Sequence, residues 1–293
     1  MQRTVFPHKV LPWLLLAPQL AVTLIFFYWP AGQAFRQSTL REDPFGLSST
    51  FVGLANFRRV LSDPSYLNAL QVTVVFSLFV AFLPMVIALF LAVQAEKIVR
   101  GRGVYRTLMI WPYAVATAIA GMLWLFMFNP SFGTLAWPLR QMGINWNPLL
   151  NSSHAMILVV AAATWKQISY NFLFFVAGLQ AIPRDIYEAA EMDRTSPARA
   201  FRRITLPLLW PNLLVVIVLA LIRAVQVFDE VYVLTGGGPG TSTMYLTQYI
   251  YETGFASTLR NPGVAAAASL MMGGVLVVLT LAQIALTRWR DRQ

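Results

Sequence analysis

Residues 68–95 read NALQVTVVFSLFVAFLPMVIALFLAVQA, a stretch of 28 residues without Asp, Glu, Lys, Arg or His. A transmembrane helix needs about 20 predominantly apolar residues to cross a hydrocarbon core roughly 30 Å thick. Backbone groups inside a bilayer must pair with one another, so an apolar run of this length predicts a helix. The stretch therefore predicts a membrane span.

Similar apolar runs lie on both sides of this one. The chain of 293 residues is 57% hydrophobic and 12% charged, against roughly 25% charged residues in soluble domains. The first run is longer than the ~7–15 residues of a signal-peptide core, and no small-x-small cleavage site follows it directly, so we expect it to be retained. We predict an all-α polytopic membrane protein with six transmembrane helices, at residues 11–35, 68–95, 107–128, 154–179, 206–228 and 264–286.

The basic residues predict the orientation of these spans. The net charge is +10, and the charges form short clusters between the apolar runs. With a cytoplasmic N-terminus, 14 of the 22 Lys and Arg residues fall on cytoplasmic segments and six on the opposite side. The positive-inside rule then places both termini in the cytoplasm. Residues 1–10 would be a cytoplasmic N-terminus and residues 11–293 the six-span domain. This distribution fits a membrane protein better than binding to nucleic acid.

The chemistry of the spans argues against two other classes of protein. The chain has no cysteine, and its two histidines, His8 and His154, lie far apart in the sequence. The predicted spans contain no Asp, Glu or Cys. An intramembrane enzyme needs a nucleophile with a base, or metal ligands. A secondary transporter coupled to protons or sodium commonly uses carboxylates inside the membrane. Neither class fits.

Residues 183–207, PRDIYEAAEMDRTSPARAFRRITLP, form a long basic loop between the fourth and fifth predicted spans. We expect one short helix over residues 186–193 with Asp185 as its N-cap. We expect a second over residues 198–204, capped by Ser196 with Pro197 at its first position, that stops before Pro207. By charge alone this is a solvated connector. Its two caps and its apolar face favour a docking surface.

The 183–207 loop resembles the signature loop of permease subunits of bacterial binding-protein-dependent ABC importers. That loop carries Glu-Ala-Ala followed at fixed spacing by a glycine and by Ile-x-Leu-Pro. Arg194 stands here in place of the glycine, which suggests that a left-handed backbone is not essential at this position. In the family the loop is a coupling helix seated in a cleft of the ATPase subunit. The resemblance implies ATPase coupling through Glu188, Ala189, Ala190, Asp193, Arg194, Ile204, Leu206 and Pro207.

Other stretches extend the resemblance over almost the whole chain. Residues 112–115, 178–183 and 234–239 are similar to the carbohydrate-uptake, maltose-permease-like group. Residues 29–32, 43–46, 51–54 and 165–175 are similar to permeases of sn-glycerol-3-phosphate importers. The implied solute is sn-glycerol-3-phosphate or its diesters, and a neutral sugar or oligosaccharide stays open as the alternative.

The resemblance also implies the assembly around the chain. It implies an ABC type I importer-like permease fold in the bacterial cytoplasmic membrane, surrounded by lipid. The implied partners are a second homologous permease subunit, two ATPase subunits and an extracytoplasmic solute-binding protein. ATP and Mg would bind the ATPase subunits, and this chain would hold no cofactor and catalyse no reaction itself.

Lys166 and Arg223 interrupt two predicted spans. A charge inside a span costs at least ~2.5 kcal/mol on insertion scales, so such residues usually face a cavity or a partner. Both are suited to binding phosphate. Alternatively, Arg223 pairs with Asp229 or Glu230, and Lys166 hydrogen-bonds to the backbone or to the partner permease.

Likeness to maltose permeases adds Tyr113 and Thr117, which would share one helix face at a spacing of i and i+4. Tyr113 is alternatively an aromatic side chain packed in the bundle. The predicted substrate-binding set is Tyr113, Thr117, Lys166, Gln167, Tyr170, Arg223 and Gln226.

Overall fold

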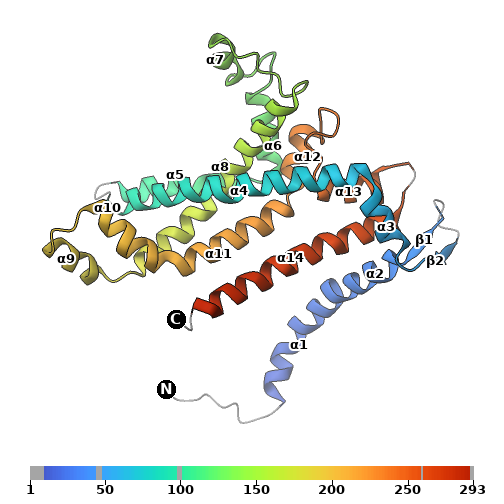
Figure 1. Ribbon diagram of the computed structural model, residues 1–293, viewed down its shortest axis with the longest axis horizontal. Helices are drawn as coiled ribbons and strands as arrows, with labels where there is room; N and C mark the ends of the chain where they lie inside the picture. Colours follow the sequence, from blue (N-terminus) through green and yellow to red (C-terminus); the bar gives the residue numbers. More distant parts are fainter. Residues whose placement is uncertain (1–9, 44–47, 98–100, 259, 291–293) are drawn as a thin grey trace. The chain divides into compact units, whose positions relative to one another are not determined.

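The computed structural model describes residues 10–43, 48–97, 101–258 and 260–290 (Figure 1). Residues 1–9 of the predicted cytoplasmic N-terminus, most of the 43–46 stretch and the last three residues lie outside the described parts. The predicted cytoplasmic position of these ends therefore stays a prediction.

The described chain is mostly helical. Its α-helices are α1 (Leu11–Thr23), α2 (Trp29–Ser38), α3 (Ala55–Ser62), α4 (Pro64–Lys97), α5 (Arg102–Ala114), α6 (Thr117–Met127), α7 (Ala136–Gln141), α8 (Ser152–Gln180), α9 (Arg184–Met192), α10 (Pro197–Ala200), α11 (Leu206–Val225), α12 (Asp229–Thr235), α13 (Leu246–Tyr251) and α14 (Pro262–Arg290). Three π-helical turns continue or join them: η1 (Leu24–Tyr28), η2 (Phe201–Thr205) and η3 (Glu252–Ala256). The fold departs from the all-α prediction in one hairpin, where β1 (Leu40–Glu42) pairs antiparallel with β2 (Ser49–Phe51).

Four helical segments in the described parts are long and apolar enough to cross a membrane, at Leu11–Ser38, Pro64–Glu96, Pro197–Val225 and Pro262–Ala285. The pair Gly103–Ala114 and Thr117–Met127 makes a fifth if a bend of 98° is counted as one broken span. By length and apolar character, the described helices therefore supply four or five spans and not the predicted six. The remaining predicted span corresponds to α8, which has 29 residues. It carries buried polar side chains such as Gln167 and Asn171, which lower its apolar character.

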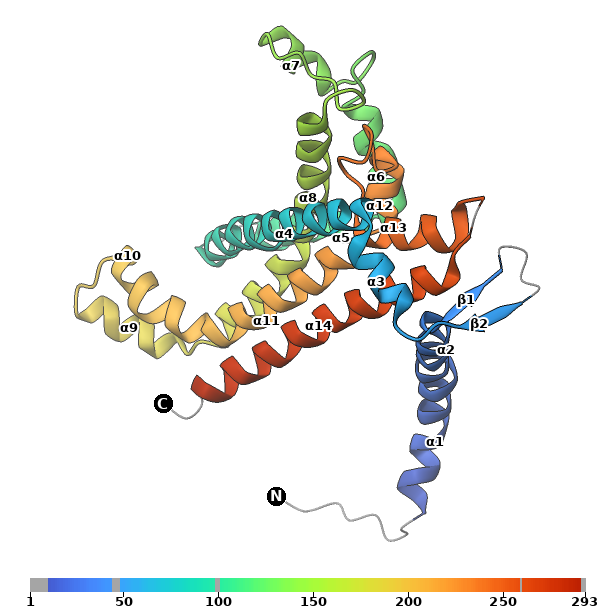
Figure 2. The same ribbon diagram turned by 45° about the vertical axis from the view of Figure 1, so that its right-hand side comes forward.

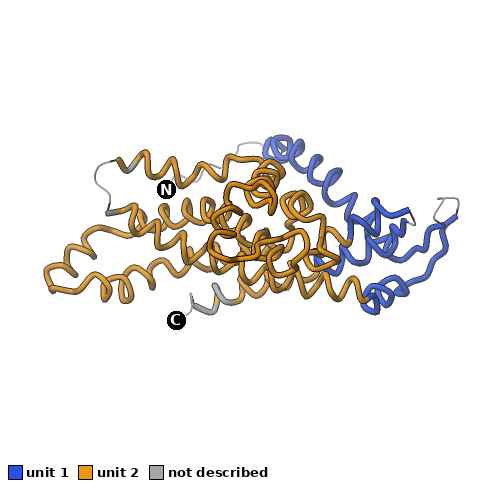
Figure 3. Tube along the Cα trace, turned by 90° about the horizontal axis from the view of Figure 1, so that it is seen from above, with its two compact units in different colours: residues 1–63, 250–273 blue, residues 64–249, 274–293 orange. Residues whose placement is uncertain are grey.

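The described chain divides into two compact units (Figure 3). The first comprises residues 1–63 and 250–273. In it, no residue of α1 is buried, as expected of a helix whose apolar side chains face lipid. Asn56 donates through Nδ2 to the carbonyl oxygens of Ser38 and Leu40, at 2.8 Å each. A Cβ at Gly263 would lie 2.2 Å from the Leu40 carbonyl oxygen, so this glycine permits a close backbone approach.

The second unit, residues 64–249 and 274–293, is built around α4, α8 and α11, which contact one another. Ala88, Ala92 and Ala95 line one face of α4 and are fully buried in a cluster with residues of α8 and α11. Small side chains let membrane helices approach closely. The crossing of α8 with α11 is equally tight, because a Cβ at Gly178 would lie 2.0 Å from Asn212 Nδ2.

The two ends of α8 lead to different regions of this unit. Asn151 caps its start by accepting hydrogen bonds from the backbone N–H groups of Ser153 and His154, at 2.9 and 3.1 Å. The chain reaches this end from α7 and leaves the other end toward α9, so that α7 and α9 lie at opposite ends of α8 (Figures 1 and 2). The candidate coupling surface is at the α9 end.

Candidate coupling surface and substrate pathway

The 183–207 loop begins with α9, Arg184–Met192, close to the predicted first helix. Its N-cap position is Pro183, whose fixed backbone suits a helix start. The prediction that Asp185 is the N-cap is wrong. Asp185 lies in the first turn instead, where its negative charge complements the helix dipole.

Arg194 ends α9 in a left-handed backbone conformation, with φ of 51°. The Arg194 N–H donates to the Glu191 carbonyl oxygen and the Thr195 N–H to the Ala190 carbonyl oxygen, at 2.9 Å each. These two bonds form a Schellman motif, in which glycine is the usual left-handed residue. The expectation that a left-handed backbone is not essential at Arg194 is therefore wrong. The chain keeps the conformation that the family glycine would adopt, although it carries a side chain there.

The two long faces of α9 have different surroundings. Arg184, Tyr187, Ala190 and Glu191 line a cavity behind the helix. The opposite face carries Asp185, Glu188, Ala189 and Met192, all exposed. Their spacing of i, i+3, i+4 and i+7 places them on one helical stripe. The Glu-Ala-Ala motif is thus divided, because Glu188 and Ala189 face outward while Ala190 is only 8% exposed.

The second half of the loop differs from its prediction at its end. Ser196 does occupy the N-cap position of α10 and Pro197 the first turn, although Ser196 makes no side-chain cap bond. The helix does not stop before Pro207. It continues through η2 into α11. The wider π-helical turn ends at Thr205, and Pro207 then stands in the first turn of α11, where a missing N–H is tolerated. The segment Pro197–Val225 is therefore one long helix.

Three predicted coupling residues lie where this long helix begins. Ile204 and Leu206 are half-buried and Pro207 is exposed, while Asp193 is exposed at the end of α9. Tyr187 Oη and Thr205 Oγ1 are 2.9 Å apart, which ties α9 to η2 by a hydrogen bond. The α9 helix is thus linked by a side-chain bond to the turn that leads into α11.

The third predicted span is broken between α5 and α6. Val115 and Ala116 have extended backbones, with ψ of 128° and 139°. Pro112, in the last turn of α5, lacks the N–H that would bond to the carbonyl oxygen of residue 108, which weakens the turn before the break. The prediction that Tyr113 and Thr117 share one helix face is therefore wrong. Tyr113 is in the last turn of α5, and Thr117 is the first residue of α6.

Lys166 of α8 reaches across to this break. Its Nζ donates to the Val115 carbonyl oxygen at 2.8 Å and to Thr117 Oγ1 at 3.3 Å. A backbone carbonyl freed by a broken helix must be satisfied in some other way inside a membrane. The structure agrees with the alternative in which Lys166 bonds to the backbone, and it also places the ammonium beside the predicted Thr117.

Arg223 meets the predicted aromatic residues. Its guanidinium carbon lies 3.5 Å from the ring centroid of Tyr170, a cation–π contact. The rings of Tyr170 and Tyr113 are stacked with centroids 6.0 Å apart. The geometry does not support the predicted alternative in which Arg223 pairs with Asp229 or Glu230. The structure instead gathers Tyr113, Tyr170 and Arg223 into one group.

Two of the predicted substrate residues lie outside these contacts. Gln226 is exposed just after α11. Gln167 is 9% exposed, and its Nε2 has no hydrogen-bond partner among the described residues. The structure thus brings together Tyr113, Thr117, Lys166, Tyr170 and Arg223 near the helix break, and it places Gln167 within the packed bundle.

The chain matches one family of membrane proteins over most of its length. Residues 84–292, most of the chain, match the family described as binding-protein-dependent transport system inner membrane component. The chain belongs to this family of importer permeases.

Curated relatives agree over nearly the full length. The permease is 54% identical over 284 residues to the sn-glycerol-3-phosphate transport system permease protein UgpA of Rhizobium meliloti, covering 97% of this chain and 96% of the relative. It is 55% identical, with the same coverage, to the UgpA protein of Agrobacterium fabrum. For UgpA of Escherichia coli the identity is 46% over 282 residues, covering 96% and 95%.

Solved structures share the fold of this permease. A crystal structure of a bacterial ABC transporter involved in import of the acidic polysaccharide alginate contains a chain with a TM-score of 0.81 and 23% identity, covering 95% of both chains. The same transporter in complex with an alginate pentasaccharide-bound periplasmic protein gives a TM-score of 0.81 at 21% identity, covering 95% and 94%. These likenesses establish the ABC importer permease fold.

The sequence offered Glu230 only as a possible partner of Arg223 and did not predict that this side chain is buried. Glu230 of α12 is 3% exposed, and its Oε1 has no hydrogen-bond partner within the described residues. A Cβ at Gly121 of α6 would lie 3.0 Å from the Glu230 carbonyl oxygen. Gly121 therefore lets α12 pack closely against α6. No local pattern marks Glu230, because its burial depends on this contact between distant segments.

Proposed function

We propose that this permease forms half of the translocation pathway of an ATP-driven importer for sn-glycerol-3-phosphate or its diesters. The observation that carries the proposal is the identity of 54% over 97% of the chain with a protein named as an sn-glycerol-3-phosphate permease. The charges near the helix break support it, because Lys166 and Arg223 are both suited to a phosphate group.

The broken span supplies a physical reason for placing the solute there. Irregular backbone at membrane depth is tolerated where it is buried in protein or lines a cavity. Discontinuous helices of transporters commonly form substrate sites. We infer that the solute passes beside residues 113–117, with Lys166 and Arg223 as the cationic contacts and Tyr113, Thr117 and Tyr170 as further walls.

We further propose six spans with both termini in the cytoplasm. The spans are the four apolar helices, the α5–α6 pair and α8. At about 1.5 Å per residue, a helix the length of α8 is more than long enough for a core of about 30 Å. Its polar residues face other helices, since Gln167 and Asn171 are buried. The distribution of Lys and Arg supports the orientation in the bacterial cytoplasmic membrane.

The exposed stripe of α9 is proposed as the surface that docks on an ATPase subunit. Asp185, Glu188, Ala189 and Met192 present a small central side chain between two acidic groups and an exposed methionine. The proposed assembly contains this chain, a second homologous permease, two ATPase subunits that bind ATP and Mg, and an extracytoplasmic binding protein. This chain itself would hold no cofactor and would cleave no bond.

Uptake by the reconstituted importer tests the proposal. The complete complex is placed in proteoliposomes with its binding protein outside and ATP inside. We expect ATP-dependent uptake of radiolabelled sn-glycerol-3-phosphate that a neutral disaccharide does not compete. Uptake of the disaccharide without uptake of sn-glycerol-3-phosphate would assign the neutral-sugar alternative, and uptake without ATP would contradict the importer mechanism.

A further inference from the structure

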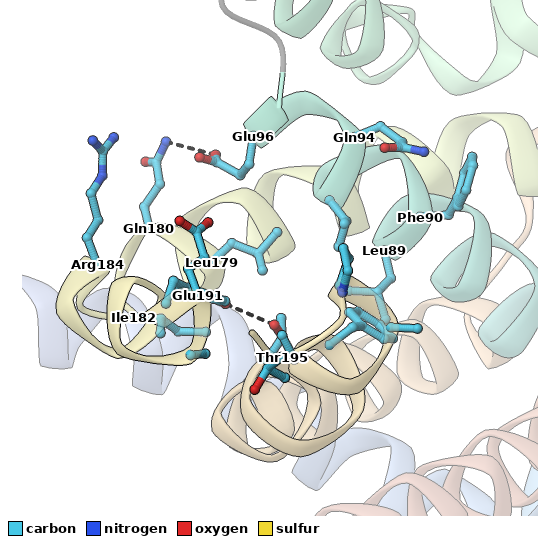
Figure 4. Close-up of a pocket in the computed structure, with 18 of the residues that line it drawn as sticks. Leu89, Phe90, Gln94, Glu96, Leu179, Gln180, Ile182, Arg184, Glu191 and Thr195 are labelled. Atoms are coloured by element: carbon cyan, nitrogen blue, oxygen red, sulfur yellow. Dashed lines mark hydrogen bonds between the residues drawn. The ribbon is translucent and has the colours of Figure 1, made fainter. Parts of the chain in front are cut away.

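A large cavity lies behind α9, on the side opposite its exposed stripe. It measures about 1230 Å³, is open on one side, and is lined by the last turns of α4 and α8 together with α9, α10 and η2, all within the second unit (Figure 4). Pockets for drug-sized ligands measure roughly 300–1,000 Å³. The cavity is therefore large enough for a bulkier molecule, and the proposed ATPase surface does not face it.

The walls of the cavity change from apolar to polar along α4. Leu89 and Phe90 line one end, and Glu96 lines the other with Gln180 and Arg184 (Figure 4). Val86, one turn before Phe90 on α4, also lines the cavity. Val86 and Phe90 are each 61% exposed although they lie on a membrane span. Exposed apolar side chains on a span face hydrocarbon, so the apolar end of the cavity opens toward lipid. An amphiphile with its chains at Phe90 and its headgroup at Arg184 matches this gradient.

The charged side chains decide which headgroup fits. The lining contains Arg184 with two acidic residues, Glu96 and Glu191. Glu96 Oε1 accepts hydrogen bonds from Arg106 Nη2 at 3.0 Å and from Gln180 Nε2 at 3.4 Å. Since Arg106 pairs with Glu96, the described lining residues leave one cation, Arg184, and one carboxylate, Glu191, whereas sites for anionic lipids are basic clusters. One guanidinium suits a phosphate, and the Glu191 carboxylate suits an ammonium group.

We propose that this cavity binds a zwitterionic phospholipid, phosphatidylethanolamine, from the leaflet that surrounds α9. Its acyl chain lies along Leu89 and Phe90, its phosphate at Arg184 and its ammonium group at Glu191. The lipid would fill the space between α4 and the α9–η2 pair, which the bond between Tyr187 and Thr205 holds together. The inference goes beyond the proposed function, because the site does not depend on which solute is carried.

Photo-cross-linking tests the site directly. The full importer complex is reconstituted in phosphatidylcholine with a small fraction of phosphatidylethanolamine that carries a diazirine on one acyl chain. After illumination, labelled peptides are mapped by mass spectrometry. We expect label on the stretch 85–93. Val93→Trp fills the cavity and should abolish this label, while Arg184→Gln should reduce it about tenfold through loss of a charged hydrogen bond.

Matched variants separate this site from general lipid contact. Val74 lies on the same helix, is 50% exposed and does not line the cavity, so Val74→Trp should leave the label on residues 85–93 unchanged. Arg199→Gln removes a charge from α10 outside the cavity lining and should also leave it unchanged. Equal labelling in Val93→Trp, or equal labelling by the matching phosphatidylglycerol probe, would overturn the proposal. Thiol cross-links from the variant Val93→Cys to the partner permease, in place of lipid, would overturn it as well.

Discussion

The 183–207 loop and the break at residues 113–117 carry the two halves of the proposed mechanism, and they are built in different ways. The end of α9 is set by Arg194 and Thr195 bonding to carbonyl oxygens within the same helix. The break is held by Lys166, which is 51 residues away from Val115 in the sequence. The proposed coupling surface is therefore encoded locally, and the proposed pathway is encoded by contacts between separate helices.

Reversing the charge of Glu188 should have the largest effect on transport. Glu188→Lys places a cation on the exposed stripe where we propose contact with a basic group of the ATPase. Loss of one partner of an interfacial charge pair typically costs 2–5 kcal/mol, so ATPase association should weaken by about thirtyfold or more and uptake should be abolished. Co-purification with the ATPase and uptake in proteoliposomes measure the two effects.

Glu191→Gln is the matched control, because Glu191 is on the cavity face of the same helix. It should retain ATPase co-purification. If Glu188→Lys also retains both the ATPase and normal uptake, the exposed stripe of α9 is not the docking surface.

Removing the charge of Lys166 should damage the pathway and leave coupling intact. Lys166→Gln removes the charged donor to Val115 and Thr117 and the nearby cation for a phosphate. We expect uptake of sn-glycerol-3-phosphate to fall about tenfold or more, since hydrogen bonds to charged groups contribute about 1.5–3 kcal/mol. ATPase co-purification should stay normal. Thr117→Val, which removes only the longer bond, should lower uptake less, and unchanged uptake in Lys166→Gln would refute the assignment.

Removing the Tyr170 ring, which contacts the Arg223 guanidinium, should have a smaller effect on transport. Tyr170→Leu removes the cation–π contact at 3.5 Å, which contributes about 0.5–1 kcal/mol where the cation is exposed. The KM for sn-glycerol-3-phosphate should rise about two- to fivefold. Phe174→Leu removes the ring next to Tyr170 without touching the guanidinium contact, and its KM should stay unchanged. Equal KM values for the two variants would show that Arg223 is not positioned by Tyr170.

The smallest expected effect is a gain in stability at Arg194. Arg194→Gly removes the strain of a left-handed backbone at a residue with a Cβ, about 1–2 kcal/mol. Glycine also makes the unfolded chain more flexible, which costs about 0.5–1 kcal/mol of stability. The expected net result is a stabilisation of about 0.5–1 kcal/mol. Thermal unfolding of the purified complex measures it. Arg199→Gly in α10 is the control and should destabilise, because glycine is a poor helix former. A lower Tm for Arg194→Gly would show that the side chain of Arg194 stabilises the turn.

The sequence predicts the long apolar helices and the first short helix of the loop well, because hydropathy and helix starts depend on neighbouring residues. It fails at Pro207, because the helix continues through η2 and this proline stands in the first turn of α11. It fails at Arg194, whose left-handed backbone is imposed by the helix end and not by residue type. It also fails at residues 115–116, since the partner of the broken backbone is Lys166 on another helix. Burial of Glu230 likewise depends on packing against Gly121.

In the proposed mechanism the exposed stripe of α9 meets the ATPase while the opposite face of the helix does not. The chain has no cysteine, so single cysteines at two adjacent alanines test it cleanly. Ala189 is exposed and Ala190 is 8% exposed. With a short thiol cross-linker and the assembled importer, Ala189→Cys should cross-link to the ATPase subunit and Ala190→Cys should not. Equal cross-linking from both positions, or cross-linking from Ala190→Cys alone, would show that the exposed stripe is not the face that meets the ATPase.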